Sequence, residues 1–125
     1  VVSNFIVQAI LNKKITIYGD GEQTRSFCFV SDLVNGLICL MESKIRGPIN
    51  IGNDHEITIN ELANLIRVKI NPSLKCNYIE LPQDDPIKRN PDLTRARKDL
   101  KWSPKIELKD GLDKTISYFK DELKN

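Results

Sequence analysis

The chain has 125 residues, 40% of them hydrophobic, which is enough for one core and one domain. Its 19 basic and 17 acidic residues are spread along the sequence and give a formal net charge of +2 at pH 7, which excludes a nucleic-acid surface built on a basic stripe. No apolar run approaches the roughly 18–20 residues of a membrane span, and three scattered cysteines with a single histidine indicate neither a disulfide framework nor a metal site.

A helical stripe opens the chain, with apolar residues at positions 1, 2, 5, 6, 9 and 10. No capping residue precedes it, so we expect that this helix begins in a longer polypeptide and that the chain is its C-terminal part. Residues 15–18 then alternate apolar and polar side chains, as in a half-buried strand.

A glycine-rich turn, Gly19-Asp20-Gly21, links this strand to a second apolar strand expected at residues 26–30. The glycines allow the backbone to approach a ligand, and the planar guanidinium of Arg25 can pair bidentately with a phosphate. A plain hairpin with a solvated arginine is the alternative interpretation. The turn is not a dinucleotide fingerprint, because Thr24 occupies the third glycine position of G-x-G-x-x-G.

The next helix is expected to be capped by Ser31 or Asp32 and to pack closely at Gly36. Its apolar residues predict a wide buried face: Leu33, Val34, Leu37, Ile38, Leu40 and Met41. A short strand is expected at residues 49–52.

The second half of the chain continues the alternation of helices and strands. Thr58-x-x-Glu61 is a capping box for a helix, and residues 76–81 form the next strand. A proline-rich extended loop follows, then a short helix capped by Asp92 and a final amphipathic helix over residues 108–123. The pattern indicates an α/β piece with short strands.

Five stretches resemble UDP-glucuronate decarboxylases (UDP-xylose synthases), members of the extended short-chain dehydrogenase/reductase family. They are VVSNFIVQAI at 1–10, YGDGEQTRSFCFVSDLV at 18–34, GPINIGN at 47–53, LPQDDPIKRNPD at 81–92 and LKWSPKIELKDGL at 100–112. The resemblance covers nearly the whole chain. It implies that residues 1–125 form a single nucleotide-sugar-binding domain, the C-terminal substrate-binding portion of an NAD(P)-binding Rossmann-type enzyme whose N-terminal cofactor domain lies outside the chain.

The resemblance implies that the intact enzyme oxidises UDP-glucuronate at C4 with NAD, releases CO2 and reduces C4 again to give UDP-xylose. That chemistry needs a Gly-rich NAD site and a Tyr-x-x-x-Lys pair, and the sequence has neither. We therefore expect the missing N-terminal portion to bind NAD and the chain alone to be inactive. The resemblance further implies a homodimer, with a UDP-sugar as ligand and no membrane contact by this chain. The compartment stays open between the cytoplasm and an anchored form in the Golgi.

Two segments carry the substrate-binding residues that the resemblance implies: Thr16, Ile17, Tyr18, Gln23 and Arg25 in the first, and Gln83 and Arg89 in the second. Arg25 is expected on the diphosphate. Arg89 matches an arginine assigned as a proton donor in some relatives, but the very high intrinsic pKa of any guanidinium group favours an electrostatic role. Asp84 and Asp85 are neighbours in an extended loop and point apart, so we expect them to shape the loop and hold Arg89 rather than to form an acid/base pair.

Other enzymes share the two-arginine pattern, so a dTDP-glucose 4,6-dehydratase or a nucleotide-sugar epimerase is an alternative. The QDDP-x-x-R-x-PD and QTRSF runs favour the decarboxylase group. A second alternative is a stand-alone, non-catalytic nucleotide-sugar-binding module. The sequence upstream of residue 1 separates these possibilities.

Overall fold

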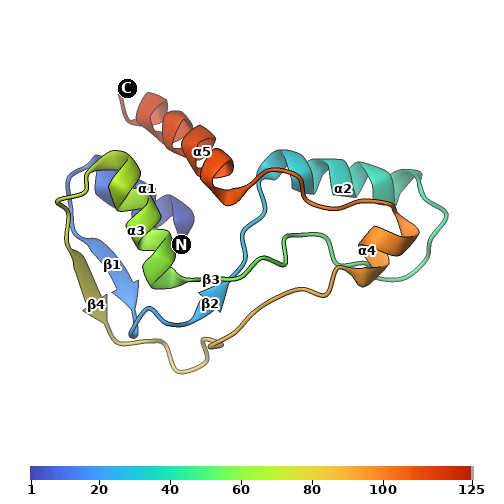
Figure 1. Cartoon of the computed structure of the whole chain (residues 1–125), viewed down its shortest axis with the longest axis horizontal. Coiled ribbons are helices and arrows are strands. Elements are labelled where there is room, and N and C mark those ends of the chain that lie inside the picture. The colour runs from blue at the N-terminus through green and yellow to red at the C-terminus, as the bar shows by residue number, and fades with distance from the viewer. Residues whose placement is uncertain (125) are drawn as a thin grey trace.

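The computed structural model describes residues 1–124 (Figure 1). Helices and short strands alternate along the chain, as the sequence predicts. In order they are α1 (Val2–Ile10), β1 (Ile15–Tyr18), β2 (Thr24–Arg25), α2 (Val30–Glu42), β3 (Ile57–Thr58), α3 (Ile59–Ile70), β4 (Cys76–Ile79), α4 (Thr94–Asp99) and α5 (Leu108–Leu123).

The main core lies where α1, α3 and α5 pack together beside a two-stranded parallel sheet (Figure 1). β1 pairs with β4 in parallel, from Ile15 opposite Cys76 to Tyr18 opposite Ile79, and α3 lies in the crossover between them. Five of the six largest fully buried side chains lie at strand and helix positions that the sequence periodicity predicts: Ile6, Ile15, Ile17, Leu62 and Ile66.

The strand expected at residues 26–30 is wrong in extent. Only Thr24–Arg25 forms β2, which pairs antiparallel with β3, while residues 26–29 belong to no strand within the described part of the chain. The short strand expected at 49–52 is likewise not formed among residues 1–124. A β-strand needs a hydrogen-bonded neighbour, and apolar composition alone does not supply one.

Three polar residues near helix starts behave differently. Thr58 caps α3 as expected, because its Oγ1 accepts a hydrogen bond from Glu61 N (3.0 Å). Asp92 Oδ1 accepts from Thr94 N (2.9 Å), so it serves the first turn of α4. Asp32 is not a cap: α2 begins at Val30, and the buried Asp32 carboxylate instead accepts from the backbone N–H groups of Lys105 (2.9 Å) and Ile106 (2.8 Å).

The wide buried face expected on α2 is wrong for most of its residues. Leu33, Val34, Leu37, Ile38 and Met41 are all exposed, with Met41 at 83%. The covered side is the one at Gly36, where an added Cβ would lie 3.0 Å from the Trp102 ring, so the expected close packing at this glycine is confirmed. In Figure 1, α2 lies beside α4 at the end of the molecule away from the main core. No helix in the described range is long and apolar enough to cross a bilayer.

We expect the isolated chain to self-associate through this exposed apolar face of α2, because contiguous apolar surface drives association in water. Sedimentation velocity should show an average mass that rises with concentration. The double substitution Leu37→Glu and Ile38→Glu should reduce this rise, whereas Ser117→Glu on the exposed side of α5 should not. Monomeric sedimentation of the parent chain at every concentration would contradict the prediction.

Candidate functional site

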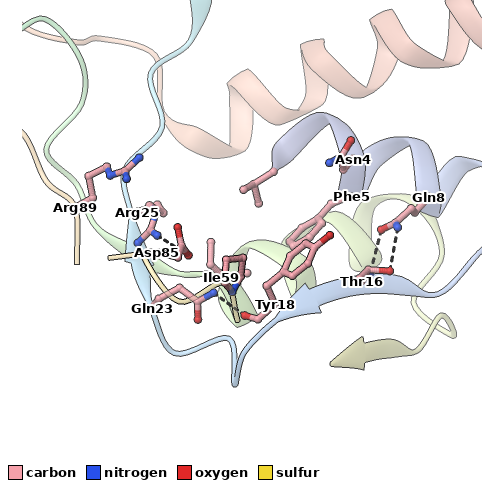
Figure 2. A pocket seen from close by; sticks show the side chains of 12 residues that line it. Asn4, Phe5, Gln8, Thr16, Tyr18, Gln23, Arg25, Ile59, Asp85 and Arg89 are labelled. Carbon is pink, nitrogen blue, oxygen red and sulfur yellow. Dashed lines mark hydrogen bonds and ion pairs between the residues drawn. The ribbon is translucent and has the colours of Figure 1, made fainter. Parts of the chain in front are cut away.

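A cavity of about 370 Å³ lies between α1, β1, the β2 segment with the residue before it (23–25) and the loop of residues 82–89 (Figure 2). Its size is near the lower end of ordinary small-molecule sites. Apolar, amide and charged side chains share its wall: Val1, Asn4, Phe5, Gln8, Thr16, Tyr18, Gln23, Arg25, Ile59, Pro82, Asp85 and Arg89.

Most of the residues expected to bind substrate meet at this cavity. Thr16, Tyr18, Gln23, Arg25 and Arg89 all line it. The other two expected residues do not. The side chain of Ile17 lies in the core with 1% exposure, because successive residues of a strand face opposite sides, and Gln83 is exposed on the loop outside the lining.

Gln8 on α1 fixes the β1 side of the cavity. Its Nε2 donates to Thr16 Oγ1 (3.1 Å), and its Oε1 accepts from Thr16 N (3.0 Å) (Figure 2). β4 pairs with one edge of β1. The Gln8 side-chain amide accepts the hydrogen bond of Thr16 N on β1, as a backbone carbonyl of a neighbouring strand would. Gln8 therefore orients Thr16, a role that the sequence reasoning missed.

The turn after β1 is held in place by the start of α3. Asn60 N donates to Gly21 O (2.9 Å), and Asn60 Nδ2 donates to Asp20 O (3.0 Å). Gly21 has φ +77°, and a Cβ there would collide with the Asn60 side chain. The glycine therefore serves a close approach within the protein itself, which fits the conclusion that this turn is not a dinucleotide fingerprint.

Gln23 is buried at the base of the cavity. Its Nε2 donates to Tyr18 O (2.8 Å), and its backbone O accepts from Ile59 N (3.0 Å). The bond to Tyr18 O sets the amide plane, so the side-chain oxygen of Gln23 is the end left to accept a hydrogen bond from a ligand. Figure 2 shows Gln23 beneath Arg25 and Asp85.

Arg25 projects from β2 with its side chain 13% exposed. Its Nη2 donates to Asp85 Oδ2 (3.1 Å) and to Pro86 O (2.7 Å), and its Nη1 donates to Thr24 O (2.7 Å). Asp85 was expected to shape the loop and hold Arg89. It does contact an arginine, but the arginine is Arg25.

Arg89 follows on the same loop and also faces the cavity (Figure 2). Its side chain is exposed, and it makes no hydrogen bond or ion pair with any of residues 1–124. The charged side chains of the wall are thus two guanidinium groups and one carboxylate, an excess of positive charge that suits a phosphate or carboxylate ligand.

Seven lining residues are not among the substrate-binding residues that the sequence predicts: Val1, Asn4, Phe5, Gln8, Ile59, Pro82 and Asp85. Phe5 and Ile59 sit in amphipathic helices, where an apolar residue at the edge of the core looks like any other core residue. Pro82 and Asp85 both lie in the LPQDDPIKRNPD run at 81–92, so that motif indicates them as candidate site residues.

The described residues do not supply a site for NAD or for a metal ion. No strand–turn–helix unit among residues 1–124 presents a glycine-rich turn to an outside ligand, since Gly21 is filled by Asn60. The described part of the chain also holds no cluster of three potential metal-ligating side chains, and its three cysteines are free. Burial, with a smaller effect from Asp32, raises the pKa of the Cys28 thiol, which disfavours a reactive thiolate there.

Comparison with known proteins bears directly on this site. A family model described as NAD dependent epimerase/dehydratase family matches residues 1–52. The whole chain is 46% identical to UDP-glucuronic acid decarboxylase 1 of Xenopus tropicalis and 47% identical to that of Arabidopsis thaliana. The resemblance to UDP-glucuronic acid decarboxylases is confirmed. The chain spans 30% and 29% of the length of these two relatives.

Solved structures share the fold. UDP-glucose 4-epimerase of Thermotoga maritima, solved with UDP-glucose, superposes with a TM-score of 0.93 at 30% identity over 98% of this chain and 40% of its own. UDP-glucuronic acid 4-epimerase of Bacillus cereus, solved with UDP-glucuronic acid and NAD, gives 0.91 at 29% identity over 97% and 40%. The chain therefore shares its fold with part of these epimerases, as expected, and the family that the matching model describes uses NAD.

Proposed function

We propose that this chain is the nucleotide-sugar-binding part of an NAD-dependent UDP-glucuronic acid decarboxylase, a carboxy-lyase that converts UDP-glucuronate to UDP-xylose and CO2. The observation that carries the proposal is the 46–47% identity to such decarboxylases over all 125 residues. Residues from four separate parts of the chain, at positions 1–8, 16–25, 59 and 82–89, form a cavity that a UDP-sugar would need, which supports the proposal further.

In this proposal the nucleoside lies along Thr16, Tyr18 and Gln23, and the diphosphate lies toward the two arginines. Thr16 and Gln23 are held rigid by Gln8 and by the Tyr18 backbone, so little order is lost when a ligand arrives. The arginines neutralise the diphosphate and supply charge-assisted hydrogen bonds. Gln83 and Ile17 play no side-chain part in this arrangement.

NAD binding is assigned to polypeptide outside this chain, since the described residues do not fit it. We therefore propose that residues 1–125 are one domain beside a cofactor domain of the complete polypeptide and that the chain alone is inactive. The complete enzyme is proposed to be a homodimer.

An epimerase or dehydratase would use a similar cavity, and solved epimerases share the fold at 29–30% identity. Fold similarity of this kind does not choose among chemistries. The higher identity to decarboxylases over the full chain favours decarboxylation.

The test is to incubate the complete polypeptide that contains this chain with UDP-glucuronate and NAD. We expect CO2 and UDP-xylose, identified by chromatography and mass. The 4-epimer of UDP-glucuronate as sole product, or turnover of dTDP-glucose alone, would overturn the proposal in favour of the alternatives. The isolated chain, assayed in parallel, should release no CO2 above a protein-free control.

A further inference from the structure

The loop that carries Arg89 is fastened to β2 by a cluster of contacts that all involve two neighbouring residues, Thr24 and Arg25. Thr24 N donates to Ile87 O (2.9 Å), and Thr24 also forms an isolated parallel bridge with Lys88. Arg25 adds its bonds to Asp85 Oδ2 and Pro86 O. The other loop residues in this cluster contact Thr24 and Arg25 through their backbone. Asp85 is the loop residue whose side chain bonds to Arg25.

The hydrogen bonds of Arg25 limit what it can offer a ligand. Both N–H groups of Nη2 are used by Asp85 and Pro86, and one N–H of Nη1 is used by Thr24 O. A guanidinium has five N–H donors, and it can make two parallel hydrogen bonds either through Nε and Nη2 or through Nη1 and Nη2. Both of these bidentate arrangements require a free N–H of Nη2. Arg25 therefore keeps only single donors for a phosphate, and the bidentate pairing expected from its sequence context is taken by the protein itself.

Arg89 is in the opposite situation. All five of its donors are unused by residues 1–124, and it lines the same cavity. An arginine of 13% side-chain exposure such as Arg25 needs a counter-charge when no ligand is bound, because an unpaired buried charge is costly. The Asp85 carboxylate, with 34% side-chain exposure, provides it.

We propose that Asp85 is a positioning residue: it holds Arg25 as the fastener of the 82–89 loop, and so places Arg89 as the guanidinium that grips the diphosphate of a nucleotide sugar. The inference rests on the proposed function, because it names what one loop does within that site. Asp84, its exposed neighbour, has no such contact among the described residues and serves as the matched control.

The fastening is tested without any ligand by amide hydrogen exchange in the complete polypeptide. The Thr24 N–H is a direct reporter, because its bond to Ile87 O exists only while the loop is docked. Asp85→Ala should speed exchange in the peptide that spans residues 22–26 by about tenfold, the factor that the loss of one charge-assisted bond implies. Asp84→Ala should leave that exchange unchanged.

The placement of Arg89 is tested by calorimetric titration with UDP as the probe. We expect Asp85→Ala to weaken UDP binding by about tenfold, Asp85→Asn to weaken it less because the amide oxygen still accepts a bond from Arg25, and Asp84→Ala to match the parent. In an Arg25→Ala background, Asp85→Ala should weaken binding no further, since its effect passes through Arg25.

Additive effects of the two substitutions, or parent-like exchange and UDP affinity in Asp85→Ala, would overturn the proposal. If Asp85→Ala does not fold, Asp85→Asn is measured alone and in the Arg25→Ala background instead. Its effects on exchange and on UDP affinity then support or overturn the proposal in the same way. A parent protein that fails to bind UDP would refute the proposed function instead, and the exchange of Thr24 would still decide whether Asp85 fastens the loop.

Discussion

Replacing Arg89 with alanine in the complete polypeptide is expected to lower kcat for UDP-glucuronate decarboxylation by about 10²-fold or more, the effect of removing one preorganised electrostatic partner. In the proposed reaction, the electron pair of the bond that breaks as CO2 leaves the oxidised sugar moves to the C4 oxygen as an enolate. Arg89 lines this cavity and donates no hydrogen bond to residues 1–124, so under the proposed function we expect its guanidinium to stabilise that charge as well as the diphosphate.

Two further substitutions sharpen this prediction. Arg89→Lys should restore little activity, because a single ammonium cannot reproduce the planar pair of bonds. Lys88→Ala, on the same loop but with an exposed side chain outside the cavity lining, should stay within about twofold of the parent, as surface substitutions usually do. Steady-state kinetics at saturating substrate measure all three. A kcat for Arg89→Ala within about threefold of the parent would reduce Arg89 to a loop residue.

The parts of the fold that rest on local periodicity could be predicted from the sequence. The stripe of α1, the capping box of α3 and the alternation of β1 each depend on residues close together in the chain. The short antiparallel pair of β2 and β3 depends on residues more than thirty positions apart, and no local pattern specifies that pairing.

The apolar face of α2 shows a different limit. Its sequence is that of a buried helix, and within the described residues that face is nevertheless open to solvent. Amphipathic periodicity predicts which side of a helix avoids water, but not whether the covering partner belongs to the same 125 residues.

The candidate site was predictable to the extent that its residues lie in recognisable runs. Thr16, Tyr18, Gln23, Arg25 and Arg89 were named from such runs and line one cavity. Ile17 faces the core instead, because side chains alternate along a strand, and the sequence of β1 itself shows this alternation. The partner of Asp85 could not be read from spacing, because its ion pair joins residues 60 positions apart.

Replacing Arg25 with alanine is expected to affect both binding and catalysis in the complete polypeptide. KM for UDP-glucuronate should rise by about tenfold or more through the loss of a cation at the diphosphate. Because Arg25 also fastens the loop that carries Arg89, kcat should fall too, though less than in Arg89→Ala. The free energy of unfolding should fall by roughly 1–3 kcal/mol, since Thr24 O and Pro86 O lose a charged donor.

The pair of Arg97 and Asp54 offers a matched control within the same chain. It is also an arginine–aspartate ion pair, with Nη1 2.8 Å and Nη2 3.2 Å from the two carboxylate oxygens, but it lies outside this cavity and both side chains are more exposed. The hydrogen bond from Arg97 holds the pKa of Asp54 below its ordinary value. The pair therefore adds to the stability of the fold at any pH above the ordinary pKa of an aspartate, and this stabilisation is lost as the pH falls through the lowered pKa.

Arg97→Ala should therefore change the free energy of unfolding near neutral pH much less than Arg25→Ala does, as the loss of an exposed, solvent-screened pair does, and it should leave KM and kcat unchanged. Denaturant unfolding and steady-state kinetics are measured on Arg25→Ala and Arg97→Ala. Effects that both variants share reflect the loss of an arginine–aspartate ion pair, and effects seen in Arg25→Ala alone reflect the release of the 82–89 loop. If Arg25→Ala raises KM but leaves kcat, stability and the exchange of the Thr24 amide at parent values, Arg25 is a ligand for the diphosphate alone and the loop holds Arg89 without it.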